Sequence, residues 1–228
     1  MKRRDVLRDQ WASLGVAFAY GGTLQCDPET ALINFVGSSE FPEDKKMISL
    51  VLAWLQEYSS FVHIEKLKTS TLNLEGDSLL IIGAIAVKCI KFGDQRWKAI
   101  EKLVVAKAKG YRSNLSDSEV FIKRHGLDED FLKFGIRVIP ISSENPKKLL
   151  VRERIFKMNS WLRHRLLFGT NLRADIATAK FLKLTDTAYG AAKLLGCSMN
   201  AAYRNWKDLT EAGWGESSLE IGSSKGSN

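Results

Sequence analysis

A run of polar side chains near the end of the chain has the residue types that read nucleic-acid bases. Six residues fall on the outer face of a helix expected over 199–212 or on its cap: Ser198, Asn200, Ala201, Arg204, Asn205 and Lys207. Arginine hydrogen bonds bidentately to guanine and asparagine to adenine, while lysine and serine bond to phosphates or bases. This combination favours contact with the major groove of double-stranded DNA.

Three helices are expected to position these side chains, over 172–182, 187–195 and 199–212. Ser198 is expected to cap the third helix, because a serine hydroxyl accepts a hydrogen bond from the first helical turn. Gly196 lies between the second and third helices, where a helix-turn-helix needs a residue that tolerates an unusual backbone angle. The pattern predicts a tight turn between two crossed helices.

Small residues mark the inner faces of these helices. Ala191 and Ala192 allow a second helix to approach closely, and Ala202, Trp206 and Leu209 repeat at spacings of four and three. This periodicity predicts a core stripe on the third helix. A plainer interpretation stays open, in which two ordinary packing helices are joined through a glycine.

The segment 171–221 resembles the winged helix-turn-helix domain of bacterial transcription regulators. The phrase AAYRNWKDLTEAGW is similar to the recognition helix and exit of that superfamily, and LRHRLLFGTNLRADIATAKFL is similar to the segment that precedes such domains in a group of bacterial proteins with a helical N-terminal region. The family pattern has two wing strands after Gly213. Here 217–221 is one candidate strand and 222–228 follows at the wing tip, so we expect a short or truncated wing.

The resemblance implies a DNA-binding transcriptional regulator with double-stranded DNA as its partner. The third helix would then enter the major groove, with Arg173 and Lys193 at phosphates. The N-terminal region is expected to mediate homodimerisation or to sense a partner or effector whose nature the sequence leaves open.

The charge distribution is compatible with a polyanionic partner. The chain carries a formal net charge of +8 and a pI of about 9.4. Residues 151–215 contain 11 Lys and Arg against 5 Asp and Glu, whereas residues 1–150 contain 22 against 19. The basic excess is therefore concentrated in the C-terminal third, as nucleic-acid binding favours.

Composition and cysteine usage predict a globular, cytoplasmic protein. Of the 228 residues, 45% are hydrophobic and 26% charged, which is ordinary globular chemistry. Cys26, Cys89 and Cys197 are widely spaced, as free thiols of a reducing compartment are. The longest apolar run, 79–87, is about half the length that a bilayer crossing needs. We expect no signal segment and no membrane contact.

The expected fold is mainly α, in three parts: a helical N-terminal domain over 1–146, a connecting helix over 147–170, and a winged helix-turn-helix domain over 171–228. Within the first part, Pro28 is expected to open a helix capped by Asp27. The apolar segment Leu79–Phe92 fits a buried strand or a buried helix, and its length and alanines favour the helix. Other expectations are a strand over 134–142, one long helix over 147–168, and an apolar helix face made of Met47, Leu50, Val51, Trp54, Leu55 and Tyr58.

No catalytic or metal-binding motif is recognised. Neither a phosphate loop nor a dinucleotide-binding glycine pattern occurs, and His63, His125 and His164 lie far apart without partners at metal-ligand spacing. The sequence therefore predicts no cofactor and no metal. Trp11 and Trp214, near the ends of predicted elements, are candidates for contact with a partner.

Two other functions stay open. Glu75 and Asp77, followed by Lys88, loosely resemble the acidic residues of a metal-dependent nuclease. A DNA-linked enzyme or toxin-antitoxin component, of nuclease or nucleotidyltransferase type, is the first alternative. The second is an adaptor that uses its winged helix for protein contact.

Overall fold

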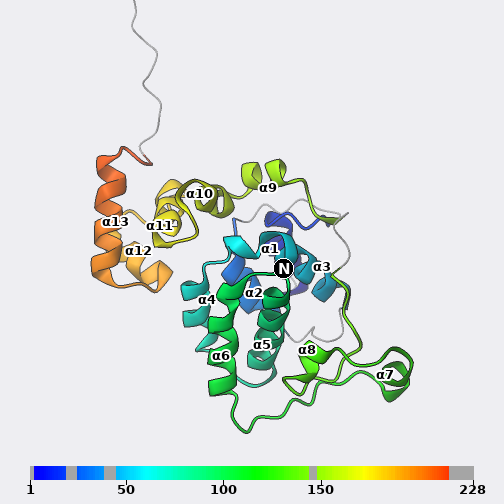
Figure 1. Cartoon of the computed structure of the whole chain (residues 1–228). Helices are drawn as coiled ribbons and strands as arrows, with labels where there is room; N and C mark the ends of the chain where they lie inside the picture. Colours follow the sequence, from blue (N-terminus) through cyan, green and yellow to red (C-terminus); the bar gives the residue numbers. More distant parts are fainter. Residues whose placement is uncertain (1–2, 19–24, 39–44, 144–147, 216–228) are drawn as a thin grey trace, which may run out of the picture. The chain divides into compact units, whose positions relative to one another are not determined.

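The computed structural model describes residues 3–18, 25–38, 45–143 and 148–215 and is mainly helical (Figure 1). The predicted mainly α class is thus confirmed, and the described residues contain no strand. The chain divides into two compact units, unit 1 (residues 1–170) and unit 2 (residues 171–228). The segment 147–170, predicted to connect two domains, belongs to unit 1. The candidate wing strand at 217–221 lies outside the described residues.

Unit 1 contains short and medium helices. Their bounds are α1 (Arg3–Ser13), α2 (Pro28–Val36), α3 (Lys45–Tyr58), the 3-10 turn η1 (Ser59–Phe61), α4 (Ile64–Thr71), α5 (Gly76–Lys91), the 3-10 turn η2 (Gln95–Trp97), α6 (Lys98–Lys107), α7 (Glu119–His125), α8 (Glu129–Leu132), α9 (Arg152–Met158) and α10 (Ser160–Phe168).

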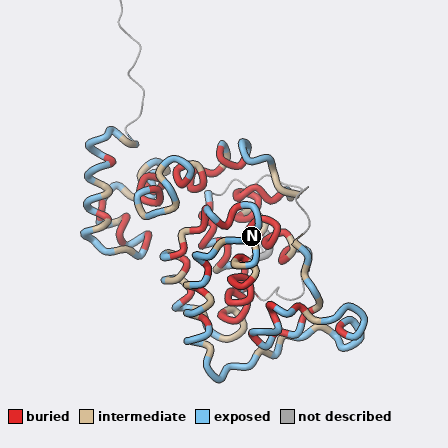
Figure 2. Tube along the Cα trace, viewed as in Figure 1, coloured by how far each residue is buried: buried red, intermediate tan, exposed pale blue. Residues whose placement is uncertain are grey.

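Helix α5 is the centre of this unit and is buried along most of its length (Figure 2). It contacts α2, α3, α6 and α8, as the grouping of these helices in Figure 1 also shows. A Cβ atom at Gly83 would lie 2.7 Å from the Phe134 ring and 2.8 Å from Val104 Cγ1. Glycine at this position therefore allows Phe134 and α6 to pack directly on α5, and the helix predicted over 79–92 is confirmed.

Helices α2 and α3 complete the core as their sequences predict. The Asp27 carboxylate accepts a hydrogen bond from the Thr30 amide at 3.0 Å, with Pro28 as the first helical residue. All six residues of the predicted α3 face are buried. Trp54 donates its indole N–H to the Leu14 carbonyl at 2.7 Å and packs edge-on against Trp11, 5.8 Å between ring centroids. Trp11 is fully buried, so the expectation that it contacts a partner is wrong.

The strand predicted over 134–142 is not formed. Ile136 and Val138 are buried, as the alternating pattern requires, but the segment pairs with its neighbour only through an isolated bridge between Ser116 and Arg137. Alternating buried side chains, such as Ile136 and Val138, show that the backbone here is extended. A strand also needs a continuous partner, and the loop that contains Ser116 provides one bridge only.

The single long helix predicted over 147–168 is two helices, α9 and α10. They are separated at Asn159, whose backbone is extended and whose side chain is buried. The Asn159 amide donates to the carbonyls of Ser13 and Cys26 at 3.1 and 2.9 Å, and its Oδ1 accepts from the Leu162 amide at 3.1 Å. These three hydrogen bonds hold Asn159 in the extended conformation that separates α9 from α10. The apolar periodicity of the segment gives no sign of this break.

A buried ion pair attaches α10 to α2. Arg165 donates two hydrogen bonds to the Glu29 carboxylate, at 2.9 and 2.8 Å, and a third to the Phe61 carbonyl at 2.7 Å. The exposed fraction of the two side chains is 0% and 1%. Glu29 also accepts from the His63 amide at 2.7 Å. One carboxylate and one guanidinium thus join three segments that are distant in the sequence.

The stability of unit 1 is expected to depend on pH through His164. Burial, with a smaller effect from the neighbouring Arg163, lowers the pKa of His164 from 6.5 to about 4. The unfolded chain therefore binds a proton at a higher pH than the folded chain does. Wild type should lose up to about 3 kcal/mol relative to His164→Gln as the pH falls from 7 to 4. Urea unfolding of both proteins across this range measures the difference, and parallel curves would contradict it.

Candidate nucleic-acid interface

Unit 2 is a bundle of three capped helices: α11 (Leu172–Phe181), α12 (Ala188–Leu195) and α13 (Met199–Glu211). Each pair of helices is in contact. The N-caps are Asn171, Thr187 and Ser198, whose side chains accept from the amides of Ala174, Gly190 and Ala201 at 3.1, 3.0 and 3.3 Å, respectively. The predicted cap at Ser198 is confirmed. All three helices of unit 2 therefore begin with a side chain that caps a backbone amide of the first turn.

The connection between α12 and α13 is a three-residue turn that begins at Gly196. This glycine has φ +63° and ψ +32°, the left-handed conformation, and the Cys197 amide donates to the Ala192 carbonyl at 3.1 Å. A Cβ at Gly196 would meet no described atom within 4 Å. Glycine is therefore required by the backbone angle and not by space. This confirms the predicted role of Gly196.

The inner faces of the three helices are lined with small side chains. Ala191, Ala192 and Ala202 are buried where α12 packs on α13, and Leu209 is buried near the end of α13. Trp206 was predicted to complete this stripe but is only half-buried. The Lys180 ammonium lies 5.3 Å from the centroid of its ring, so a cation covers the indole instead of apolar packing.

Trp214 is a structural residue of the unit. Its indole N–H donates to the Ala177 carbonyl of α11 at 3.1 Å, and its amide donates to the Leu209 carbonyl at 2.8 Å. These bonds hold the segment after α13 against α11. The indole N–H is therefore engaged within the unit.

The outer face of α13 carries most of the predicted base-reading residues. Ser198, Asn200, Arg204 and Lys207 are exposed, and Ala201 is half-buried. No group in the described part of the chain bonds to the side chains of Asn200 or Arg204. Both therefore have their full hydrogen-bonding capacity available to a ligand.

Arg173 and Asn205 are engaged with each other. Arg173 forms an ion pair with Asp208 at 2.6 Å and donates to Asn205 Oδ1 at 3.3 Å. The Asn205 amide nitrogen donates to the Ala201 carbonyl at 2.8 Å. A phosphate would have to compete with Asp208 for Arg173, so these two residues join α11 to α13 in the free protein.

Two lysines near this face differ in their surroundings. Lys193 on α12 is exposed, and within the described residues no acidic group pairs with it. Lys207 lies 3.7 Å from Glu211, one helical turn further along. Surface ion pairs of this kind contribute little to stability.

Exposed apolar side chains occur on the same two helices and were not singled out in the sequence. Tyr189 and Leu194 on α12, and Met199 and Tyr203 on α13, have exposed fractions between 44% and 67%. Their exposure could have been predicted from the sequence, because residues 199 and 203 are four residues apart and fall outside the Ala202–Leu209 core stripe of the same helix. They add apolar and aromatic contact area beside Arg204.

The basic excess of the C-terminal third is shared between the two units. Five of its eleven basic residues lie in α9 and α10, where Arg165 is buried against Glu29. Residues 171–215 contain six Lys and Arg against four Asp and Glu. A nucleic-acid contact by unit 2 would thus depend on local placement of charge on α13 more than on net charge.

The residues of the nuclease alternative lie on α5 and at its N-cap. Glu75 and Asp77 flank the first residue of α5, and Lys88 lies three turns further along. Lys88 forms ion pairs with Asp128 and Asp130, at 2.7 and 3.2 Å. Among the described residues, no group of three or more His, Cys, Asp or Glu side chains is arranged to hold a metal ion.

Comparisons with known proteins give no match: no family model, no curated protein and no solved structure is detectably similar to the chain. In the described part, none of the helices has the length and hydropathy needed to span a bilayer. Unit 2 is thus defined by its geometry as a three-helix unit with a glycine turn before its last helix.

Proposed function

We propose that the chain is a DNA-binding transcriptional regulator that places α13 in the major groove of double-stranded DNA. The observation that carries this proposal is the outer face of α13, where Asn200 and Arg204 are exposed and unbonded within the described residues. They follow a left-handed glycine turn and a serine cap. The resemblance to winged helix-turn-helix regulators supports the same function.

The spacing on α13 suits base reading. Asn200, Arg204 and Lys207 are separated by four and three residues and lie along one side of the helix. At a rise of about 1.5 Å per residue they span roughly 10 Å, which is the length of about three base pairs. We assign Arg204 to a guanine, Asn200 to an adenine, and Lys207 and Lys193 to phosphates.

A protein-contact function is the second candidate, favoured by one specific observation. Tyr189, Leu194, Met199 and Tyr203 are exposed on α12 and α13. Exposed aromatic and methionine side chains are enriched at protein interfaces. An adaptor of this kind would bind its partner through these residues and would show no steep dependence on salt.

Arg204→Ala should weaken binding of the full chain to duplex DNA by about 1–3 kcal/mol. Fluorescence anisotropy with a labelled genomic fragment, measured over a series of salt concentrations, gives the affinity and its salt slope. Wild-type affinity should fall steeply with salt, because phosphate contacts release counterions. The matched control is Arg154→Ala, which removes the same charge from an exposed position on α9.

The two candidates give different results in this experiment. Equal DNA affinity for Arg204→Ala and wild type would contradict the assignment of α13. Failure of the wild-type chain to bind duplex DNA at low salt would contradict DNA binding itself and favour the adaptor.

A further inference from the structure

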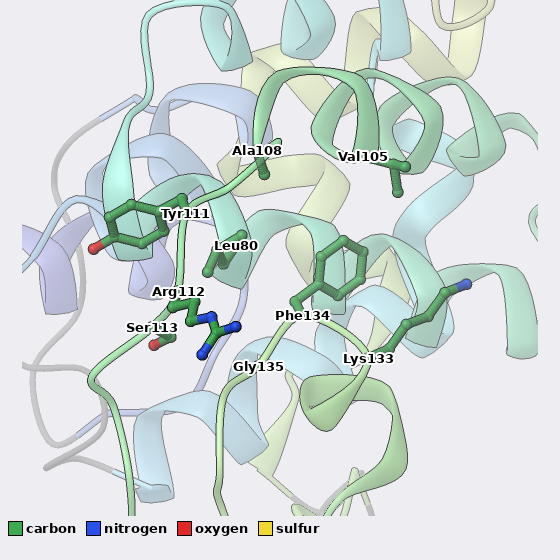
Figure 3. Close-up of a pocket in the computed structure, with 9 residues that line it drawn as sticks. All are labelled: Leu80, Val105, Ala108, Tyr111, Arg112, Ser113, Lys133, Phe134 and Gly135. Atoms are coloured by element: carbon green, nitrogen blue, oxygen red, sulfur yellow. The ribbon is translucent and has the colours of Figure 1, made fainter.

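Unit 1 contains an open cavity of about 610 Å³. Its lining comes from α5, from the end of α6 and the residues that follow it, and from the turn after α8 (Figure 3). This volume is in the range of small-molecule sites in proteins, about 300–1,000 Å³. Leu80 and Phe134 in this lining belong to the core of unit 1, and none of the lining residues belongs to unit 2.

The body of the cavity is apolar. Leu80, Val105, Ala108 and the Phe134 ring line it, with Tyr111 at one side (Figure 3). Val105 on α6 and Tyr111 in the loop after it are exposed, with exposed fractions of 54% and 45%. An apolar ligand body would cover surface that now faces solvent.

The backbone fixes the position of the Phe134 wall. Gly83 on α5 leaves the space in which the Phe134 ring packs, and Gly135 turns the chain at φ +76°. A larger residue at position 83 would displace the ring, because its Cβ would lie 2.7 Å from it. The wall is therefore held by packing on α5.

The charge of the cavity is positive. None of the nine described lining residues is acidic, and two, Arg112 and Lys133, are basic. Lys133 extends away from Arg112 in Figure 3 and pairs with Glu101. In contrast, no acidic or carbonyl group of the described residues bonds to the Arg112 guanidinium. One cation is thus left without a counter-charge beside an apolar wall.

Ser113 adds a donor next to this cation. Its hydroxyl oxygen accepts a hydrogen bond from the Leu115 amide at 3.0 Å, which leaves the hydroxyl proton available to donate. An arginine fork and a serine hydroxyl together match the oxygens of a carboxylate.

We propose that this cavity binds a small aromatic carboxylate, with its ring against Leu80, Val105 and Phe134 and its carboxylate on Arg112 and Ser113. A monoanion matches the single uncompensated guanidinium, and the Tyr111 and Phe134 rings favour an aromatic body. The site would give unit 1 a ligand-binding role. It stands independently of the DNA-binding proposal, because it uses no residue of unit 2.

The test is a titration of the full chain with 1-naphthoate, followed in two-dimensional amide NMR spectra. We expect saturable shifts confined to the lining residues. Arg112→Gln should weaken binding about tenfold or more, because it removes a charge-assisted hydrogen bond. Arg112 makes no bond within the described structure, so this variant should fold as wild type does.

Controls separate a specific site from general anion binding. Arg124→Gln removes an exposed charge from α7 and should leave the affinity unchanged, whereas Ala108→Phe should fill the cavity and abolish binding. The neutral 1-naphthamide should bind at least about tenfold more weakly than 1-naphthoate. The proposal is overturned if no shifts appear up to the solubility limit, if they scatter over other surfaces, or if Arg112→Gln or the amide binds as tightly.

Discussion

Replacing Arg165 by methionine is expected to lower the free energy of unfolding of unit 1 by about 3–5 kcal/mol. The substitution leaves the Glu29 carboxylate buried without its bidentate partner and removes the bond to the Phe61 carbonyl. Burial raises the pKa of Glu29 to about 7, and the guanidinium opposes that rise. Urea unfolding is measured at pH 8, at which the Glu29 carboxylate of the wild type is ionised. Without the guanidinium the pKa of Glu29 should rise further, so uptake of a proton by the carboxylate would place the loss at the lower end of this range.

The control for this effect is removal of both partners. In the double variant Glu29→Leu, Arg165→Met no charge is left buried alone, so the loss should be much smaller than the sum of the two single losses. Arg154→Met, at an exposed position of α9, should change the stability by less than about 0.5 kcal/mol. Strictly additive single and double variants would show that Arg165 and Glu29 do not act as a pair.

Leu209→Ala is expected to destabilise unit 2 by about 2–5 kcal/mol and thereby to abolish DNA binding. Leu209 is buried at the end of α13, in a small core whose other buried apolar residues are Ile176, Leu195 and several alanines. A cavity in so small a core removes much of its apolar burial. The loss of the α13 surface follows from unfolding, although Leu209 itself would not touch the DNA.

Amide hydrogen exchange distinguishes this local effect from a global one. Exchange should accelerate in residues 172–215 of Leu209→Ala and stay unchanged in the α5 core of unit 1, because each unit has its own buried core. The matched control is Leu194→Ala, which removes an exposed leucine from α12. Equal acceleration in both variants, or none in Leu209→Ala, would contradict the core role of Leu209.

The local features of the two units could be predicted from the sequence. Asp27, Ser198 and Gly196 act within three or four residues of their own position, so their roles as caps and turn are visible in short segments. The α3 face could be predicted for a similar reason, because one period of 3.6 residues determines which side chains share a side. Helix α5 was predicted on other grounds, from the length of its apolar run and its alanines, because nearly uniform hydrophobicity shows no such period.

Long-range contacts could not be predicted. Arg165 and Glu29 are 136 residues apart, and nothing near either residue indicates the other. The break at Asn159 depends on the carbonyls of Ser13 and Cys26, which the fold brings to it. On α13 the residue types were visible, but the Arg173–Asp208 ion pair was not, because it joins two helices.

The cavity in unit 1 illustrates the same limit. Arg112 and Phe134 are separated by loops, and each looks unremarkable in its own segment. They line one cavity because Gly83 lets the Phe134 ring pack on α5 and Gly135 turns the chain there. A ligand site of this kind is assembled entirely by tertiary packing.

The central claim, that α13 reads bases in the major groove, is tested most directly by selection of binding sites from a pool of randomised duplexes. Wild-type protein and Arg204→Ala are selected in parallel at the same salt concentration. The account predicts a defined site for the wild type and, for the variant, loss of preference at one base pair with the rest of the site retained. An unchanged site for Arg204→Ala, or no enriched site for the wild type, would contradict it.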